Sequence, residues 1–267
     1  MRTQLAFIAQ NDLPGIEDDA RFCQEFGFEG LEYNYWADFD ARETEYFKKI
    51  QAIQHAYGIR CVMLGIWGWN PIAPEPGERE KARAQLERAV EFARILEAQV
   101  LTMNAGRFGD DLERNVAEFA GAFSPILRKL EDSGITPAFY ALHGNTFLND
   151  ITAYEKLWET VPGALIKYDP ANWRHAGKDY LDVVRRHGDK IAHVHIKEHL
   201  YHAGTLASQP PAGMGDIQWG KVFAFLYEHH YDRALSIEPH GPVWSRGDMR
   251  LKMLRLTQRF IAPFLIE

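Results

Sequence analysis

The sequence predicts a single (β/α)8 barrel that occupies residues 1–267. Eight hydrophobic runs with the composition of strands alternate with eight amphipathic segments that have helical spacing. Strict alternation of this kind requires a parallel sheet with helical crossovers, and eight units in about 250 residues match the closed barrel. A doubly wound open sheet is the alternative. It is disfavoured because no Gly-x-Gly-x-x-Gly fingerprint follows the first strand.

The pattern places the elements in a regular order along the chain. Strands are expected at residues 5–9, 28–33, 59–66, 99–104, 135–143, 165–169, 191–197 and 234–238. Helices are expected at residues 16–26, 42–57, 78–97, 111–132, 149–160, 179–187, 219–230 and 247–264. Gly27 and Gly58 follow the first two helices, where a left-handed residue commonly ends a helix. Pro170 and Pro239 end two of the strands, and a long loop is expected at residues 199–215.

The composition excludes several classes of function. The formal net charge is −7, whereas a protein that binds a nucleic-acid backbone needs a basic surface, so no nucleic-acid partner is expected. The chain contains no run of eighteen apolar residues, so no membrane span is expected. Cys23 and Cys61 form no disulfide framework, and the N-terminus enters a strand pattern without the features of a secretory signal. These observations predict a cytoplasmic protein.

Three strand ends carry residues of the types that bind metals. In the run 191–197, alternate residues share a face, so His193, His195 and Lys197 point to one side and apolar residues to the other. The run 165–169 ends in Asp169 and the run 234–238 ends in Glu238. A single buried histidine is more often a hydrogen-bonded core residue than a ligand. Two carboxylates and an imidazole at one end of a barrel nevertheless favour one divalent ion: Mn²⁺, Mg²⁺ or Co²⁺, with Zn²⁺ also accepted.

The same barrel end is expected to bind a small polar ligand. Aromatic side chains suit the C–H faces of sugars, and amides suit their hydroxyl groups. The candidate substrate-binding residues are Asn34, Trp67, Asn104, Asn172 and Trp173. Any single tryptophan here is more simply explained by loop packing. Arg107, Arg174 and Arg246 lie in loops of the same end, where a surface ion pair is the simplest role for each and binding of a carboxylate or phosphate the alternative.

Four segments together resemble one known family. They are GFEGLE at 27–32, HVHIKE at 193–198, GMGDIQW at 213–219 and LSIE at 235–238. In this order they are similar to the xylose isomerase-like superfamily of TIM barrels, which includes ketose 3-epimerases, hydroxypyruvate isomerases, inosose dehydratases and endonuclease IV. The resemblance implies that Asp169, His195 and Glu238 are metal ligands. Related barrels often pair, so a homo-oligomer is also an expectation.

The sequence departs from the family pattern at two positions. The family's fourth ligand is usually a Glu at the end of the fifth strand, where this chain has Ala141. His143 lies two residues further on, and in a continuing strand it would share the face of Ala141 and could replace the missing ligand. Alternatively, the site has lost its metal. Asn172 stands where many members have a His, and it can bind a hydroxyl group but cannot act as a base.

The resemblance implies a metal-dependent isomerase or epimerase that acts on a sugar, a polyol or a small hydroxy-carbonyl compound through an enediolate. Glu238 would be the base, with Lys197, His240 or His143 as the second proton-transfer group. The alternatives are a dehydratase that acts on a keto-polyol, or a degenerate sugar-binding barrel. An endonuclease is disfavoured because Trp67 and Asn104 stand where that branch would need further zinc ligands.

Overall fold

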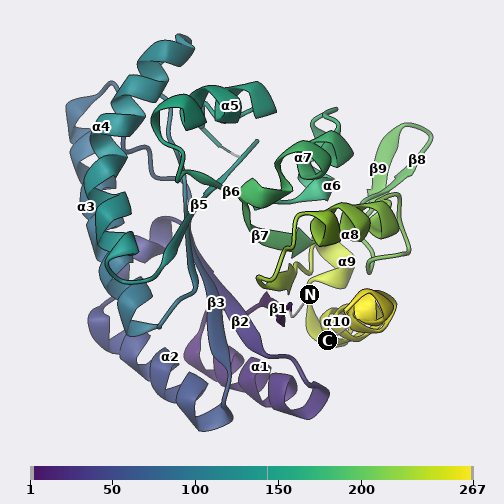
Figure 1. The fold of residues 1–267 in the computed structure, drawn as a ribbon. Coiled ribbons are helices and arrows are strands. Elements are labelled where there is room, and N and C mark those ends of the chain that lie inside the picture. Colours follow the sequence, from purple (N-terminus) through teal and green to yellow (C-terminus); the bar gives the residue numbers. More distant parts are fainter. Residues whose placement is uncertain (1–2, 143, 266–267) are drawn as a thin grey trace. The chain divides into compact units, whose positions relative to one another are not determined.

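The structure is a computed structural model that describes residues 3–142 and 144–265. Within these residues, eight parallel strands form a closed barrel in the order β1-β10-β7-β6-β5-β4-β3-β2 (Figure 1). The strands are β1 (Leu5–Ile8), β2 (Gly30–Tyr35), β3 (Arg60–Ile66), β4 (Val100–Met103), β5 (Thr136–Tyr140), β6 (Leu165–Tyr168), β7 (Ile191–Ile196) and β10 (Leu235–Ile237). This topology confirms the predicted (β/α)8 fold. That residues 1–267 form one domain stays a prediction.

The chain divides into two compact units. The first comprises Met1–Ile8 and Tyr168–Glu267, and the second comprises Ala9–Lys167. In the first unit, β10 pairs with both β1 and β7, so the N-terminal strand joins elements from the far end of the chain. In the second unit, β2 to β6 pair in sequence order. Each unit is described separately below.

In the second unit, each helix packs beside the next helix along the chain. The helices are α1 (Leu13–Phe26), α2 (Thr44–Tyr57), α3 (Pro76–Ile95), α4 (Leu112–Glu131) and α5 (Ile151–Thr160), with a 3-10 turn η1 (Ala37–Ala41) after β2. Gly27 and Gly58 end α1 and α2 in the left-handed conformation, as predicted. Phe47 and Phe92 stack with their ring centroids 4.1 Å apart, and such ring pairs fill the space between the helices.

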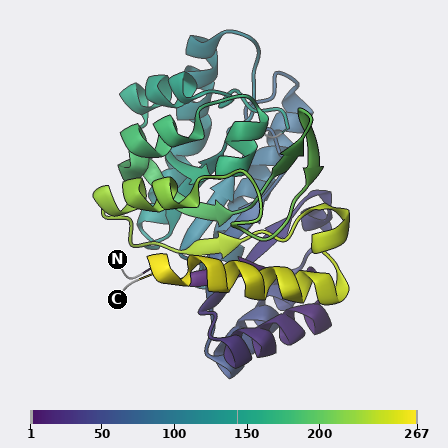
Figure 2. The same ribbon diagram turned by 90° about the vertical axis from the view of Figure 1, so that its right-hand side faces the viewer.

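The first unit contains the remaining helices. They are α6 (Pro170–His175), α7 (Tyr180–His187), α8 (Trp219–Glu228), α9 (Gly241–Trp244) and α10 (Gly247–Ile261), with 3-10 turns η2 (Gly188–Lys190) and η3 (Ala262–Phe264). The last long helix, α10, is the yellow helix in Figure 2. Its buried residues include Met253 and Leu254. The hydrophobic side of α8 includes Phe223, which stacks on Phe264 at 4.8 Å.

Two local predictions were wrong, and two short helices were not predicted. The expected loop at 199–215 contains an antiparallel hairpin, β8 (Leu200–His202) and β9 (Thr205–Ser208), whose turn has positive φ at Ala203 and Gly204. The two helices that were not predicted are α6, which begins directly after Asp169 at the end of β6, and α9, which begins after residues 238–240, which follow β10. Finally, β5 ends at Tyr140 rather than at residue 143. Among the described helices, none is long and apolar enough to cross a membrane.

Candidate active site

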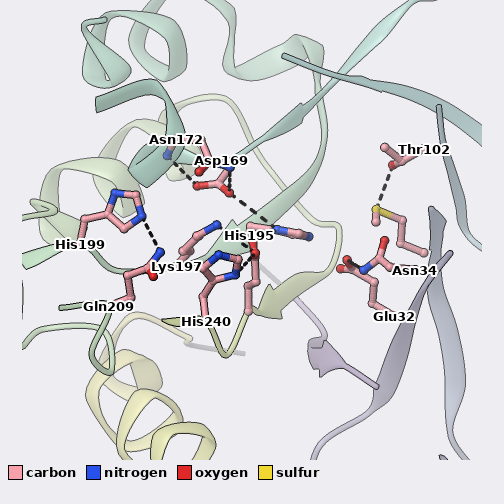
Figure 3. Close-up of polar contacts among 12 residues, drawn as sticks. Glu32, Asn34, Thr102, Asp169, Asn172, His195, Lys197, His199, Gln209 and His240 are labelled. Carbon is pink, nitrogen blue, oxygen red and sulfur yellow. Dashed lines mark hydrogen bonds and ion pairs between the residues drawn. The ribbon is translucent and has the colours of Figure 1, made fainter. Parts of the chain in front are cut away.

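Asp169 stands at the junction between β6 and α6. The strand ends at Tyr168, Pro170 begins the helix, and Asp169 caps it because its Oδ1 accepts a hydrogen bond from the backbone N–H of Asn172 at 3.0 Å. The side-chain amide of Asn172 donates to Oδ2 at 2.5 Å. Both carboxylate oxygens are therefore oriented by one residue. Asn172 and Asp169 appear together in Figure 3.

Glu238 follows β10 and accepts hydrogen bonds from three nitrogen groups of the first unit. His195 Nδ1 lies 2.7 Å from Oε2, while Lys197 Nζ and His240 Nδ1 lie 2.9 and 3.0 Å from Oε1. His195, Lys197 and His240 lie close together in Figure 3. The register explains part of this arrangement, because Ser236 of β10 pairs with His195 of β7. Residues two positions further along two parallel strands meet at the same edge. The backbone N–H of Glu238 also donates to Ile196 O.

The charges in this cluster hold each other in the ionised state. Burial alone would favour neutral Glu238, but Lys197 and the two imidazoles outweigh it and place the pKa of Glu238 well below its usual range. Burial likewise opposes the ammonium form of Lys197, yet Glu238 and Asp169 raise the pKa of Lys197. The cluster thus holds a carboxylate and an ammonium group in contact within a buried site.

Asp169, His195 and Glu238 together fit a divalent metal ion. One ligand atom from each residue lies within 4.8 Å of the others, and His195 Nδ1 lies 3.8 Å from Asp169 Oδ2. Two carboxylate oxygens and one imidazole nitrogen form a donor set that suits Mn²⁺, Mg²⁺, Co²⁺ or Zn²⁺. The three strand-end residues predicted from the sequence therefore lie close together. Their role as ligands stays a prediction.

The end of β5 does not support a fourth metal ligand at position 143 by strand alternation. Such alternation requires β5 to continue past Ala141, but the strand ends at Tyr140 and Leu142 has φ of +68°, a left-handed value that no strand contains. The strand alternation that related Ala141 to position 143 therefore does not apply. His143 itself lies outside the described residues, and its role as a ligand stays a prediction. Ala141 is buried and offers no ligand atom.

Glu198 organises the loop that follows β7. It is 1% exposed, and its carboxylate accepts hydrogen bonds from the backbone N–H groups of His199, Gly213 and Ile217 and from the indole N–H of Trp219. Burial raises the pKa of Glu198, and these hydrogen bonds oppose that rise. Two of the family-like segments, 193–198 and 213–219, are thus in direct contact. Both segments were identified from the sequence, but the hydrogen bonds that Glu198 makes between them were not predicted.

His199 is a buried residue beside the cluster that sequence reasoning did not select. Its Nε2 faces the side-chain amide nitrogen of Gln209 at 3.1 Å, which connects the residues before β8 and after β9 (Figure 3). Burial and the nearby Lys197 charge lower the pKa of His199 to about 4, so the ring is neutral at pH 7. His199 lies in a segment predicted as a loop, and nothing in the neighbouring sequence predicts that its side chain is buried.

The predicted substrate-binding residues of the first unit have structural partners. Asn172 orients Asp169, as described above, and Trp173 is buried. Arg174 forms an ion pair with Asp216 at 3.1 Å, which agrees with the simpler role considered for it. In the second unit, Arg107 similarly pairs with Asp110 at 2.6 Å. Substrate contacts at Asn172 and Trp173 stay predictions.

The predicted substrate-binding residues of the second unit lie at or just after the ends of β2, β3 and β4. Asn34 and Trp67 are joined, because the indole Nε1–H donates to the Asn34 amide oxygen at 2.8 Å. Asn104 is buried, and its amide oxygen accepts a hydrogen bond from the backbone N–H of Gly106 at 2.9 Å. Their contact with a substrate stays a prediction.

Comparison with known families agrees with the fold. The model of the xylose isomerase-like TIM barrel family matches residues 20–259. The chain therefore belongs to this family of (β/α)8 barrels. No curated protein sequence matches the chain.

Several solved structures are similar over nearly their full length. D-Psicose 3-epimerase from Clostridium cellulolyticum H10 is 16% identical, with a TM-score of 0.78 and coverage of 98% of this chain and 99% of that one. The probable 3-DHS dehydratase AsbF from Bacillus anthracis is 17% identical, with a TM-score of 0.72 and coverage of 98% and 99%. The IolI protein with a bound zinc atom is 13% identical, with a TM-score of 0.74 and 98% coverage of both chains. At these identities the likeness establishes the fold.

Proposed function

We propose that this protein is a metal-dependent isomerase or epimerase that acts on a sugar, a polyol or a small hydroxy-carbonyl compound through an enediolate. The observation that carries the proposal is the convergence of Asp169, His195 and Glu238 within 4.8 Å, with the Lys197 ammonium 2.9 Å from Glu238. The family relationship and the similar solved structures, which include a sugar epimerase and a protein with a bound zinc atom, support the same class.

Asp169, His195 and Glu238 would hold the ion. A bound divalent ion supplies Lewis acidity, which polarises a carbonyl group and lowers the energy of negative charge on the adjacent oxygen. Asn172 keeps both oxygens of Asp169 in a fixed orientation, as a residue behind a metal ligand typically does. The similar structure of the IolI protein contains a bound zinc atom, so zinc belongs among the metals to be tested.

The chain's own groups can move the proton. Ionised Glu238 accepts the proton from the carbon next to the carbonyl, and the low pKa of Glu238 keeps it available as a carboxylate. Lys197 stays protonated and stabilises the negative charge of the enediolate. His240 contacts Glu238 Oε1 at 3.0 Å and has a half-exposed side chain, so it can pass the proton between Glu238 and solvent.

A dehydratase is the second candidate, and one observation favours it. The family pattern has a second carboxylate where this chain has Ala141, so one base and one ammonium acid remain in the described cluster. A base that removes a proton and an acid that protonates a leaving hydroxyl group are the two groups that elimination of water requires. Lys197 would then be the acid, and the probable 3-DHS dehydratase AsbF is among the similar structures.

The first experiment measures metal binding and hydrogen exchange together. Purified protein is analysed for bound metal and titrated with Mn²⁺, Co²⁺ and Zn²⁺ by calorimetry, beside the Asp169→Asn variant. Metal-loaded protein is then incubated in D2O with a panel of ketoses and inososes. Deuterium in recovered or isomerised sugar indicates an enediolate, and loss of water indicates the dehydratase.

A matched control separates the site from general charge effects. Asp182→Asn removes an exposed carboxylate on α7 that pairs with Arg185 and Arg186, so it should leave metal binding and exchange unchanged. Glu238→Gln should abolish deuterium incorporation. Wild-type protein that binds none of these metals, or exchange that survives in Glu238→Gln, would refute the proposal.

A further inference from the structure

The short helix α6 and the β8–β9 hairpin are two small elements of the first unit that contact each other. α6 has six residues, and a helix of that length is not stable by itself in water. The hairpin has only two strands, and every residue from 202 to 207 is exposed. An isolated two-stranded hairpin is marginally stable at best. Each element therefore needs contacts from outside itself to keep its position.

Tyr201, the second residue of β8, supplies the contacts between the hairpin and α6. Its hydroxyl group lies 2.7 Å from Nδ1 of His175, and its ring centroid lies 4.8 Å from the guanidinium carbon of Arg174. Arg174 and His175 are the last two residues of α6, and the helix and the hairpin lie side by side in Figure 1. A hydrogen bond and a cation–π contact thus hold the end of the helix against the hairpin.

Asp216 holds both partners of this contact. Its Oδ2 accepts a hydrogen bond from the backbone N–H of Tyr201 at 2.7 Å and lies 3.1 Å from Nη1 of Arg174. Asp216 belongs to the segment 213–219, in which the buried carboxylate of Glu198 accepts hydrogen bonds from two backbone N–H groups and one indole. The base of the hairpin and the end of α6 are therefore both tied to a segment that is itself fixed.

The other end of α6 carries the oriented carboxylate of the candidate active site. Asp169 caps the helix, and Asn172 donates to both of its carboxylate oxygens. Trp173 is 2% exposed and anchors the buried side of the helix, while Tyr201 contacts its C-terminal end. Because six residues make fewer than two turns, the two ends of α6 cannot become disordered independently. Order at the hairpin is thus connected to order at Asp169.

We propose that Tyr201 is a positioning residue: through it the β8–β9 hairpin orders α6, and α6 in turn keeps the Asp169 carboxylate oriented by Asn172. Without this contact the helix frays from its C-terminal end, and the hydrogen bonds to Asp169 form for a smaller fraction of the time. The consequence for metal binding rests on the proposed function, in which Asp169 is a ligand. The ordering of α6 does not rest on it and can be measured without metal.

Amide hydrogen exchange in the metal-free protein tests the ordering of α6. Exchange is followed in α6 and in the core strand β7 for wild type, Tyr201→Ala, Tyr201→Phe and His202→Ala. Phenylalanine keeps the ring that contacts Arg174, and His202 is the next, exposed residue of the same strand. We expect α6 to exchange about three- to tenfold faster in Tyr201→Ala, the size of one such contact. Exchange should rise less in Tyr201→Phe and stay unchanged in His202→Ala.

Arg174→Gln removes the same contact from the side of the helix. Glutamine is a good helix former, but it lacks the guanidinium group that lies on Tyr201 and pairs with Asp216. Exchange in α6 should therefore rise to a similar degree, while exchange in β7 stays as in wild type. The proposal is overturned if α6 exchanges at the wild-type rate in both Tyr201→Ala and Arg174→Gln, or if its exchange rises only as much as that of β7.

Mn²⁺ affinity, measured by calorimetry on the same proteins, tests the consequence for Asp169. Tyr201→Ala should bind Mn²⁺ about three- to tenfold more weakly, a smaller loss than is typical for a group in direct contact with a ligand, and Tyr201→Phe should restore most of the affinity. Faster exchange in α6 with wild-type Mn²⁺ affinity would show that the hairpin orders the helix without positioning Asp169, which overturns the proposal. Wild-type protein that binds no metal would instead refute the isomerase proposal, and the exchange rates would then decide by themselves whether Tyr201 orders α6.

Discussion

Asn172 shows how one residue can support a site through its neighbour. Its backbone and side-chain N–H groups both donate to Asp169, so we expect Asn172→Ala to free that carboxylate. Groups behind a metal ligand typically change metal affinity by about 10- to 100-fold, and we expect a loss of that size for Mn²⁺. Calorimetry measures it directly.

The control for Asn172→Ala is Asn11→Ala, because Asn11 is an exposed asparagine close to the start of α1. Alanine is favourable inside a helix, so the substitution in α6 should not unfold the protein. Unchanged Mn²⁺ affinity in Asn172→Ala would show that the hydrogen bonds from Asn172 do not help Asp169 to bind the metal, or that Asp169 is not a ligand.

His199 predicts a pH dependence of stability. Burial lowers the pKa of this histidine to about 4 from an ordinary value of 6.5, so the unfolded chain takes up the proton more readily. Stability should therefore fall as the pH is lowered from about 6.5 to about 4, because over this range the unfolded chain binds the proton more readily than the folded protein does.

His199→Gln removes this titration and keeps an acceptor for Gln209. Urea unfolding at pH 7, 5.5 and 4 should show a smaller loss of stability in the variant than in wild type. All other groups titrate in both proteins, so the difference isolates His199. Parallel pH profiles for the two proteins would show that His199 accepts a proton freely in the folded state.

At the scale of elements, the loop after β7 depends on a glycine that must lack a side chain. A Cβ on Gly215 would lie 2.5 Å from Glu198 Cγ and 2.6 Å from the backbone oxygen of His199. Because Glu198 is buried and fully hydrogen-bonded, it cannot move away cheaply. We expect Gly215→Ala to lower the free energy of unfolding by about 1–3 kcal/mol, measured by urea denaturation.

Gly220→Ala is the matched control for this prediction. Gly220 lies in α8 with no atom within 4 Å of an added Cβ, so alanine should raise stability by about 0.5–1 kcal/mol. If Gly215→Ala lowers the free energy of unfolding and Gly220→Ala raises it, the loss at Gly215 comes from crowding around Glu198 and not from the general effect of replacing a glycine. Equal changes in the free energy of unfolding for the two variants would contradict this explanation.

The elements also show what the sequence could predict. Hydrophobic alternation placed every barrel strand, because strands buried on both faces give strong apolar runs. The six-residue α6 is too short for a helical period to appear. The β8–β9 hairpin has one local sign, the Ala203-Gly204 pair with positive φ, which is weaker than an Asn-Gly turn. The end of β5 depends on the left-handed Leu142, which no propensity predicts.

The candidate site also contains some residues whose positions could be predicted from the sequence and others whose positions could not. Asp169, His195 and Glu238 were predictable because parallel strands bring their ends to one edge whatever the loops do. The hydrogen bonds from Asn172 and the burial of His199 were not, since they depend on how α6 and the β8–β9 hairpin pack. Side chains fixed by strand topology are readable from sequence, whereas side chains fixed by loop packing are not.

At the scale of the whole molecule, metal binding should be visible as stability. A ligand that binds only the folded protein raises the free energy of unfolding by about 2.7 kcal/mol at one hundred times its dissociation constant. For a chain of this size that corresponds to roughly 5–10 °C in the melting temperature. We expect Mn²⁺ or Zn²⁺ to produce such a shift in wild type, reversed by EDTA and absent in Asp169→Asn.

The two compact units make this prediction more specific. Asp169, His195 and Glu238 all belong to the unit formed by Met1–Ile8 and Tyr168–Glu267. If calorimetry shows one transition, the metal should move all of it, because the units then unfold together. If it shows two, only the transition of the unit with the ligands should move. A shift of equal size in Asp169→Asn, or a shift confined to the transition of Ala9–Lys167, would place the metal elsewhere and remove the structural basis for the isomerase proposal.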